Sequence, residues 1–352
     1  MKGGILRIIA VNFVCVFLVL YSFYSYISPD VIAEKKESEV IVSQKNDTSL
    51  DKSDKKQEIE ESSKEAVTSS KVNSSKASTG SKPVSAEAVK GKVISRYISP
   101  YNTSLSYDKV YVKNSTNLQI SIKNFLSGKI KFSIKKNNEP QVLILHTHAT
   151  ETFMEEDAEY FTEEFSSRSR DNTKNMVAVG SIVAKKLNDA GIKTIHSKTL
   201  HDYPSYTASY SRAADTICGY LEKYPSIKVV LDLHRDAVTD DDGNKIKLTT
   251  EIDGKKAAQV MLVMGSQSGS VTNFPKWQEN FKLAVKLQQI MEKNYPTLAR
   301  PIMLMSKNYN ESLTTGSLLL EFGTDVNSLD EVFYSAQMVG DSIVELLNSI
   351  CN

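Results

Sequence analysis

Apolar positions divide the chain into regions of different periodicity, and the first region is almost entirely apolar. Residues 8–27 read IIAVNFVCVFLVLYSFYSYI. A helix of about 20 residues, rising about 1.5 Å per residue, spans the roughly 30 Å hydrocarbon layer of a bilayer. Lys2 and Arg7 precede this run, and tyrosines gather at its far end. By the positive-inside rule, the pattern predicts a transmembrane anchor over residues 1–28 with the rest of the chain outside the cytoplasm.

The alternative for this segment is a secretory signal peptide that is removed. Residues 31–33, Val-Ile-Ala, loosely resemble a cleavage site. The apolar run is longer than the roughly 7–15 residues of a signal-peptide core, which favours an uncleaved anchor. We therefore expect a single-pass protein of the cell membrane whose C-terminal domain is extracytoplasmic.

Polar residues dominate the next region. Residues 29–92 are rich in Ser, Lys and Glu, and from Glu34 onward they contain no aromatic side chain. Such a composition cannot bury enough apolar surface to offset the conformational entropy of the chain. The region is predicted to be a disordered linker between the anchor and a folded domain.

Periodic apolar patterns resume at Val93. Residues 93–139 contain short strand-like segments, which we interpret as a strand-rich extension. Over residues 140–352, short apolar runs typical of buried strands alternate with amphipathic helical segments. The runs are QVLIL at 141–145, IKTIH at 192–196, KVVLDLH at 228–234, AQVMLVMG at 258–265 and GSLLLEFG at 316–323. This alternation predicts an α/β domain with a single twisted, largely parallel sheet flanked by helices.

Charge and cysteine content narrow the class of protein. The 43 basic and 42 acidic residues give a net charge of +1. This balance provides no basic field for nucleic acid, which is therefore not an expected partner. Cys15, Cys218 and Cys351 form no C-x-x-C motif, which argues against a zinc ribbon or a thiol redox motif. Cys218 is expected to be a small buried side chain of a helix.

Residues that bind metals follow three of the predicted strands, in the segments VLILHTH, VVLDLHRDA and LLLEFG. Because ligands of such sheets bind beyond the carboxyl ends of the strands, we expect His148 and His234 to lie close together. Two neutral imidazoles, one or two carboxylates and a water are the ligands of a catalytic zinc ion, which activates water for amide hydrolysis. Glu321 ends an apolar run, so its pKa is expected to be raised into the range of a catalytic acid or base.

Other polar residues near these segments have simpler interpretations. His196 and His201 are expected to be hydrogen-bonded residues of the core or of a turn. Arg235 could hold a charged group of the substrate or pair with a neighbouring carboxylate. The sequence contains no H-E-x-x-H motif, no G-x-S-x-G elbow and no phosphate-binding loop, so the common metalloprotease, serine hydrolase and nucleotide-binding signatures are absent.

Five motifs in sequence order carry a family resemblance: HTHATE, SRDNTKNMVAVG, HDYPSYTASYSR, DLHRDA and LLLEFGTDVNS. Over residues 140–350, and in its anchor-and-linker layout, the chain resembles the stage II sporulation protein P (SpoIIP) family. Its C-terminal region is also similar to zinc N-acetylmuramoyl-L-alanine amidases. That resemblance matches His148 and His234 to two histidine ligands of the metal and Glu321 to the catalytic glutamate.

The third protein ligand is not assigned by the resemblance. The amidases have a glutamate shortly before their first long helix, where this chain has Asp171. Glu151 stands much nearer to His148 in the sequence, and His146 is a further candidate. All three remain alternatives at this stage.

The resemblance also implies an activity and partners. It implies a membrane-anchored, Zn²⁺-dependent peptidoglycan hydrolase that cleaves the amide between muramic acid and the stem peptide, with endopeptidase activity on cross-links as a second activity. It implies a role in engulfment during sporulation, together with the lytic transglycosylase SpoIID. Two other functions are weaker alternatives: a catalytically inactive peptidoglycan-binding scaffold, which has no need of the His/His/Glu set, and a membrane-tethered metalloprotease.

Overall fold

The computed structural model describes residues 89–103 and 105–352. The predicted anchor and almost all of the predicted linker lie outside these residues. Residues 85–352 form one compact unit. Within the described part of the chain, no helix is both long enough and apolar enough to cross a membrane.

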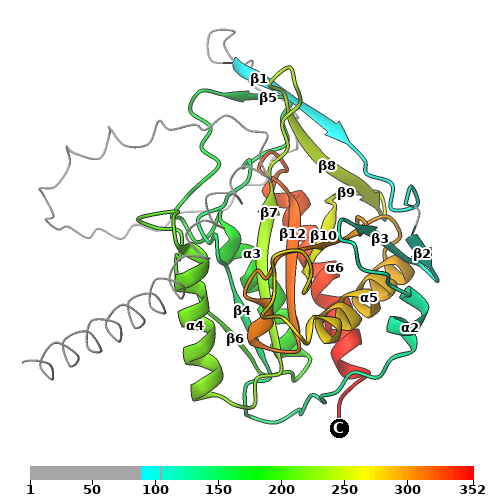
Figure 1. Ribbon diagram of the computed structural model, residues 1–352. Helices are drawn as coiled ribbons and strands as arrows, with labels where there is room; N and C mark the ends of the chain where they lie inside the picture. Colours follow the sequence, from blue (N-terminus) through cyan, green and yellow to red (C-terminus); the bar gives the residue numbers. More distant parts are fainter. Residues whose placement is uncertain (1–88, 104) are drawn as a thin grey trace, which may run out of the picture. The chain divides into compact units, whose positions relative to one another are not determined.

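The larger of two sheets has eight strands, in the spatial order β2-β3-β11-β10-β12-β7-β4-β6 (Figure 1). Strands β6, β4, β7 and β12 are parallel to one another. Strand β10 runs antiparallel to β12 and begins a second parallel block with β11 and β3. The sheet is therefore largely parallel, as predicted, but in two blocks of opposite direction. Its strands are β2 (Leu105–Tyr107), β3 (Val110–Asn114), β4 (Val142–Leu145), β6 (Thr194–His196), β7 (Val229–Asp236), β10 (Val260–Gly265), β11 (Ile302–Met305) and β12 (Ser317–Thr324).

Helices cover both faces of this sheet (Figure 1). Val142 and Ile144 of β4 belong to the main core with α3, α5 and α6, whereas Leu143 and Leu145 pack with α4. Because successive strand residues point to opposite faces, both faces of β4 are buried, which explains its unbroken apolar run. The helices are α2 (Ile122–Ser127), α3 (Met176–Asp189), α4 (Ser209–Lys223), α5 (Trp277–Asn294) and α6 (Leu329–Asn348), with a 3-10 turn at Glu311–Leu313.

Helix α6 begins at a capping box, a motif whose Ser-x-x-Glu spacing is met in the sequence by Ser328 and Glu331. The Ser328 side chain accepts a hydrogen bond from the backbone N–H of Glu331, and the Glu331 carboxylate accepts one from the backbone N–H of Ser328. Two of the backbone donors at the helix start are satisfied in this way, which fixes where α6 leaves the loop after β12.

A second sheet corrects the prediction of a single sheet. Its order is β5-β1-β8-β9. Strand β1 pairs in parallel with β8, and β3 pairs in parallel with β11 of the larger sheet. Residues 93–139 thus supply strands to both sheets, and their partners are too distant in the sequence to be recognised from a local apolar pattern. The strands of the second sheet are β1 (Val89–Arg96), β5 (Tyr160–Thr162), β8 (Lys245–Ile252) and β9 (Lys255–Ala258).

Charged residues are also buried outside the predicted site, among them Lys247 and Glu311. The Lys247 side chain on β8 is 3% exposed, and its Nζ contacts Asp157 and, at 3.2 Å, Glu331. Lys256 reaches the same Asp157 carboxylate at 2.7 Å from a side chain that is 59% exposed. Glu311 accepts one backbone N–H at 2.8 Å through Oε2, while its Oε1 has no hydrogen-bond partner. Burial raises the pKa of Glu311 well above its usual range.

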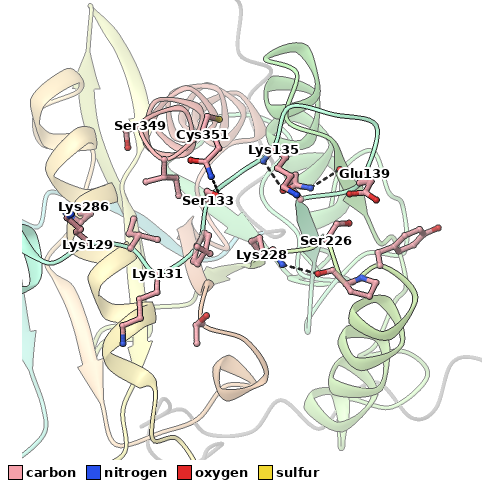
Figure 2. Close-up of a pocket in the computed structure, with 18 of the residues that line it drawn as sticks. Lys129, Lys131, Ser133, Lys135, Glu139, Ser226, Lys228, Lys286, Ser349 and Cys351 are labelled. Atoms are coloured by element: carbon pink, nitrogen blue, oxygen red, sulfur yellow. Dashed lines mark hydrogen bonds between the residues drawn. The ribbon is translucent and has the colours of Figure 1, made fainter.

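A cavity of about 1390 Å³ lies at the amino-terminal ends of β4, β7 and β12. Figure 2 shows lysines around it, among them Lys286 on α5 and Lys228 just before β7. Six lysines and one glutamate line the cavity, and no histidine does. It lies at the opposite end of the strands from the predicted catalytic residues and holds none of them.

Candidate active site

Two imidazoles meet at the carboxyl ends of adjacent strands. His148 follows β4 and His234 lies on β7, and these strands pair in parallel. The ring centroids are 5.2 Å apart with an interplanar angle of 87°, and the two residues are only 6% and 3% exposed. Glu321 on β12 lies opposite His234 in the register of the neighbouring pair. The structure thus brings together the three residues that the strand-end pattern predicted to converge.

Carboxylates surround the His234 ring. Asp232 Oδ1 lies 3.0 Å from Nε2, and Glu151 Oε2 lies 3.8 Å from Nδ1. The Asp232 carboxylate also accepts hydrogen bonds from the backbone N–H and the hydroxyl of Thr147, at 2.8 and 2.6 Å. Asp232 was missed by the sequence analysis. Its signal was its position two residues before His234, which places both side chains on the same face of β7.

Burial and neighbouring charges give these residues different pKa values. Burial lowers the pKa of His148 well below its usual range, and the positive charges of His234 and Arg168 act in the same direction. Burial also lowers the pKa of His234, but attraction to Asp232 outweighs it and raises the value to about 10. Burial raises the pKa of Glu321 to about 8. His148 is therefore a neutral imidazole with a lone pair, and Glu321 is a carboxyl group that can hold or release a proton near neutral pH.

The three alternatives for the third ligand lie in different surroundings. Glu151 is 6% exposed and approaches His234. His146 is fully buried and contacts other groups: its Nδ1 lies 2.9 Å from the Leu233 carbonyl oxygen and its Nε2 lies 2.9 Å from Nε2 of His196. Asp171 is exposed, and its carboxylate accepts hydrogen bonds from Thr173. The geometry therefore favours Glu151.

His201 has the role expected of it. Its Nδ1 lies 2.7 Å from the backbone oxygen of His146, and its Nε2 lies 2.9 Å from the Thr216 hydroxyl, so the ring is a hydrogen-bonded residue of the interior. His196 is likewise hydrogen-bonded, to His146. Cys218, in contrast, is exposed and not buried as predicted. It follows the buried Ile217 on α4, so its side chain lies on the side of the helix that faces away from the sheet.

Arg235 supports the site through the backbone. Its guanidinium donates hydrogen bonds to the carbonyl oxygens of Thr152, Asp236 and Ser167, at 3.1, 3.2 and 2.7 Å. Its backbone N–H donates to Glu151 Oε2 at 3.1 Å. These contacts fix the loop after β4 and orient the Glu151 carboxylate. Substrate binding by Arg235 stays a prediction.

Aromatic side chains that the sequence analysis did not single out lie against His148. The Tyr206 ring stacks on the imidazole with centroids 4.5 Å apart, and its hydroxyl lies 3.2 Å from Nε2. Tyr210 contacts the same imidazole edge-to-face at 5.5 Å. Both tyrosines belong to the HDYPSYTASYSR motif, in which spacing alone gives no indication that the loop folds back over the end of β4.

The donor set fits a metal ion, although no ready-made cage is present. Among residues 89–103 and 105–352, no three His, Cys, Asp or Glu side chains stand in an arrangement able to hold a metal. The donor types of His148, His234 and Glu151 are those of catalytic zinc sites. Glu321 Oε2 is shielded from solvent and has no hydrogen-bond partner. The carboxyl groups of Asp232, Glu151 and Glu321 all lie near the single His234 ring, and carboxylate oxygens together with imidazole nitrogens are the donor types that zinc accepts.

Solved structures of cell-wall amidases show a weak similarity to this chain. The CwlD amidase of Clostridioides difficile, in complex with the GerS lipoprotein, is 10% identical, with 60% of this chain and 98% of that chain covered and a TM-score of 0.39. The N-acetylmuramyl-L-alanine amidase Ami1 of Mycobacterium smegmatis is 15% identical, with 61% and 98% covered and a TM-score of 0.34. At these TM-scores the similarity establishes no shared activity.

Sequence comparison gives a clearer result. The stage II sporulation protein P of Bacillus subtilis (strain 168) is 31% identical over 216 residues, which are 58% of this chain and 50% of the relative. The chain therefore matches about half the length of that protein. The family profile described as Stage II sporulation protein P (SpoIIP) matches residues 21–344, which is most of the chain. The chain belongs to the SpoIIP family.

Proposed function

We propose that this protein is a sporulation peptidoglycan hydrolase that acts as an N-acetylmuramoyl-L-alanine amidase. The observation that carries the proposal is the convergence of His148, His234, Glu151 and Glu321 at the carboxyl ends of β4, β7 and β12, three neighbouring parallel strands. Membership of the SpoIIP family supports it. Hydrolysis of an amide needs an activated water, stabilisation of a developing oxyanion, and a group that carries a proton to the leaving nitrogen.

The chain supplies residues for each of these needs. His148, His234 and Glu151 would hold Zn²⁺, which when bound supplies a Lewis acid for water and for the amide carbonyl. Glu321 would take the proton from water and deliver it to the leaving amine, because burial raises the pKa of its carboxyl group from the usual acidic range toward neutral pH. Asp232 holds the His234 ring in a fixed orientation, as carboxylates commonly do for metal-binding histidines.

The cellular setting is part of the same proposal. The apolar run at residues 8–27 would anchor the protein in the membrane, with the hydrolase on the extracytoplasmic side where peptidoglycan lies. Cleavage of peptide cross-links and joint action with the lytic transglycosylase SpoIID in engulfment are proposed from the family resemblance.

Digestion of purified sacculi by residues 85–352 tests the proposal, because this segment forms one compact unit. Mass spectrometry is expected to detect stem peptides with a free N-terminal alanine. Exhaustive chelation and His234→Ala should abolish their release, whereas His196→Gln, outside the cluster, should retain it. Undiminished release after chelation or from His234→Ala would refute the metal mechanism. Binding to sacculi without any product would instead favour an inactive scaffold.

A further inference from the structure

Two exposed tyrosines lie in the loop that covers the candidate active site. Most large apolar and aromatic side chains of the described residues are buried, but Tyr203 is 46% exposed and Tyr206 is 51% exposed. Both belong to the segment between β6 and α4. The Tyr206 ring stacks on His148, so this exposed ring borders the catalytic cluster, and Tyr203 stands three positions earlier in the same loop. Clustered exposed aromatic surface commonly marks a binding site.

Each of these tyrosines is paired with an arginine. The Arg168 guanidinium lies 4.8 Å from the Tyr206 ring centroid, and the Arg170 guanidinium lies 4.8 Å from the Tyr203 ring centroid. Arg170 also donates a hydrogen bond to the Tyr203 hydroxyl at 2.8 Å. We call these four residues the Tyr–Arg strip. Tyrosine and arginine, together with tryptophan, are enriched among the residues that dominate the binding energy of protein–protein interfaces.

The loop that carries the strip is held by buried polar contacts. Asp202 accepts hydrogen bonds from the backbone N–H and the hydroxyl of Thr150, at 3.1 and 2.6 Å. Arg212 donates to the carbonyl oxygens of His201, Ser205 and Thr207, at 2.6, 2.5 and 3.0 Å. A loop fixed in this way presents its aromatic rings to a ligand without a large loss of conformational entropy on binding.

The two arginines differ in their charge partners. Arg168 forms an ion pair at 2.5 Å with Asp202, whose side chain is fully buried. Arg170 is exposed, and within the described residues it takes part in no ion pair. Its positive charge is therefore available to a ligand. A guanidinium binds a carboxylate with particular geometric precision, through two parallel hydrogen bonds.

We infer that the Tyr–Arg strip is the subsite that binds the glycopeptide substrate beside the catalytic cluster. A sugar ring of the glycan packs its C–H face against the exposed tyrosine surface, where the π electrons give the ring face its negative character. A carboxylate of the stem peptide binds Arg170. This inference rests on the proposed function for the class of ligand, which is peptidoglycan, and not on the cleavage step itself.

Binding and kinetics of soluble muropeptides test the inference with residues 85–352. Tyr203→Ala and Arg170→Ala are expected to weaken binding at least about fivefold, as is typical of residues central to an interface, and to raise KM more than they lower kcat. Arg170→Lys should recover part of the loss. The matched controls are Tyr107→Ala, at an equally exposed tyrosine of β2 (45%), and Arg96→Ala, at an exposed arginine of β1; both should bind as the wild type does.

A muropeptide whose stem-peptide carboxylates are amidated separates the two contacts. Wild type and Arg170→Ala should bind it equally, whereas Tyr203→Ala should still bind it more weakly. If Tyr203→Ala and Arg170→Ala behave as the controls do while the wild type binds and cleaves, the inference is wrong and the proposed function stands. If the wild type binds through the strip but releases no product, the inference stands and the hydrolase proposal fails. If the wild type neither binds nor cleaves muropeptides, both the inference and the proposed function are refuted.

Discussion

Gly180 allows helix α3 to approach the imidazoles of His146 and His196, which meet edge-to-face, and its replacement by alanine should therefore destabilise the protein. A Cβ atom at position 180 would lie 2.6 Å from Nε2 of both His146 and His196. Such contacts are far inside normal van der Waals separation. His146 cannot retreat, because it is fully buried and its Nδ1 is bonded to the Leu233 carbonyl oxygen.

Two opposing effects determine the size of the change. Alanine in a helix interior is more favourable than glycine by about 1 kcal/mol. Insertion of a methyl group into a packed site costs about 1–3 kcal/mol. Because the new methyl would meet two rings and disturb the 2.9 Å contact between them, we take the upper part of that range. The net expectation is a loss of about 1–2 kcal/mol in the free energy of unfolding, or a melting temperature lower by roughly 2–8 °C.

Urea denaturation followed by fluorescence measures this change, since the chain has a single tryptophan, Trp277, which is 6% exposed. Gly219→Ala is the matched control, because a Cβ atom there would meet nothing within 4 Å. It should stabilise the protein by about 0.5–1 kcal/mol. The double variant Gly180→Ala/His196→Ala should recover part of the loss. If Gly180→Ala stabilises the protein as much as Gly219→Ala does, the steric argument is refuted.

Three further predictions concern buried charges. Glu311→Gln should stabilise the protein at neutral pH and above, and the gain should vanish near pH 4 in urea titrations. The reason is that a carboxyl group whose pKa is raised in the folded state lowers stability at any pH at which it is ionised in the unfolded chain. An equal gain at every pH would contradict this reasoning. Lys247→Met should lower stability by about 3–5 kcal/mol because it leaves the buried Glu331 carboxylate without its charge partner, whereas Lys256→Met should cost under about 1 kcal/mol; equal losses in denaturation would count against the buried pair. Asp232→Asn should reduce hydrolysis of muropeptides by about 10–100-fold, because the His234 ring would lose the carboxylate that orients it. Unchanged turnover would show that Asp232 has no part in the reaction.

The convergence of His148, His234 and Glu321 could be predicted from the sequence because it depends only on local pattern and sheet geometry. Each residue follows or ends a short apolar run, and the carboxyl ends of parallel strands share one edge of a sheet. The capping box at Ser328 could be predicted for a similar reason, since its two hydrogen bonds join residues three apart.

The choice among the third-ligand candidates could not be predicted, because it depends on the path of the loop after β4. Glu151 is placed by bridges between distant segments: it pairs with Arg168, and the adjacent Thr152 pairs with Asn175. His146 and His148 are only two positions apart in the sequence, yet the His146 ring contacts His196 and the His148 ring contacts His234. The strand order could not be predicted for the same reason, since pairings such as β1 with β8 join residues about 150 positions apart.

Strand β12 is the last strand along the chain, but it lies inside the larger sheet, between β7 and β10. Until residue 324 has been synthesised, no strand bridges the block β6-β4-β7 and the block β10-β11-β3 within the larger sheet. Pairings of such high sequence separation form late and slowly during folding. Glu321 lies on this same strand, β12. A nascent or truncated chain therefore lacks Glu321, the proposed proton carrier, for as long as it lacks the strand that closes the larger sheet, so the completed candidate site forms only with the completed domain.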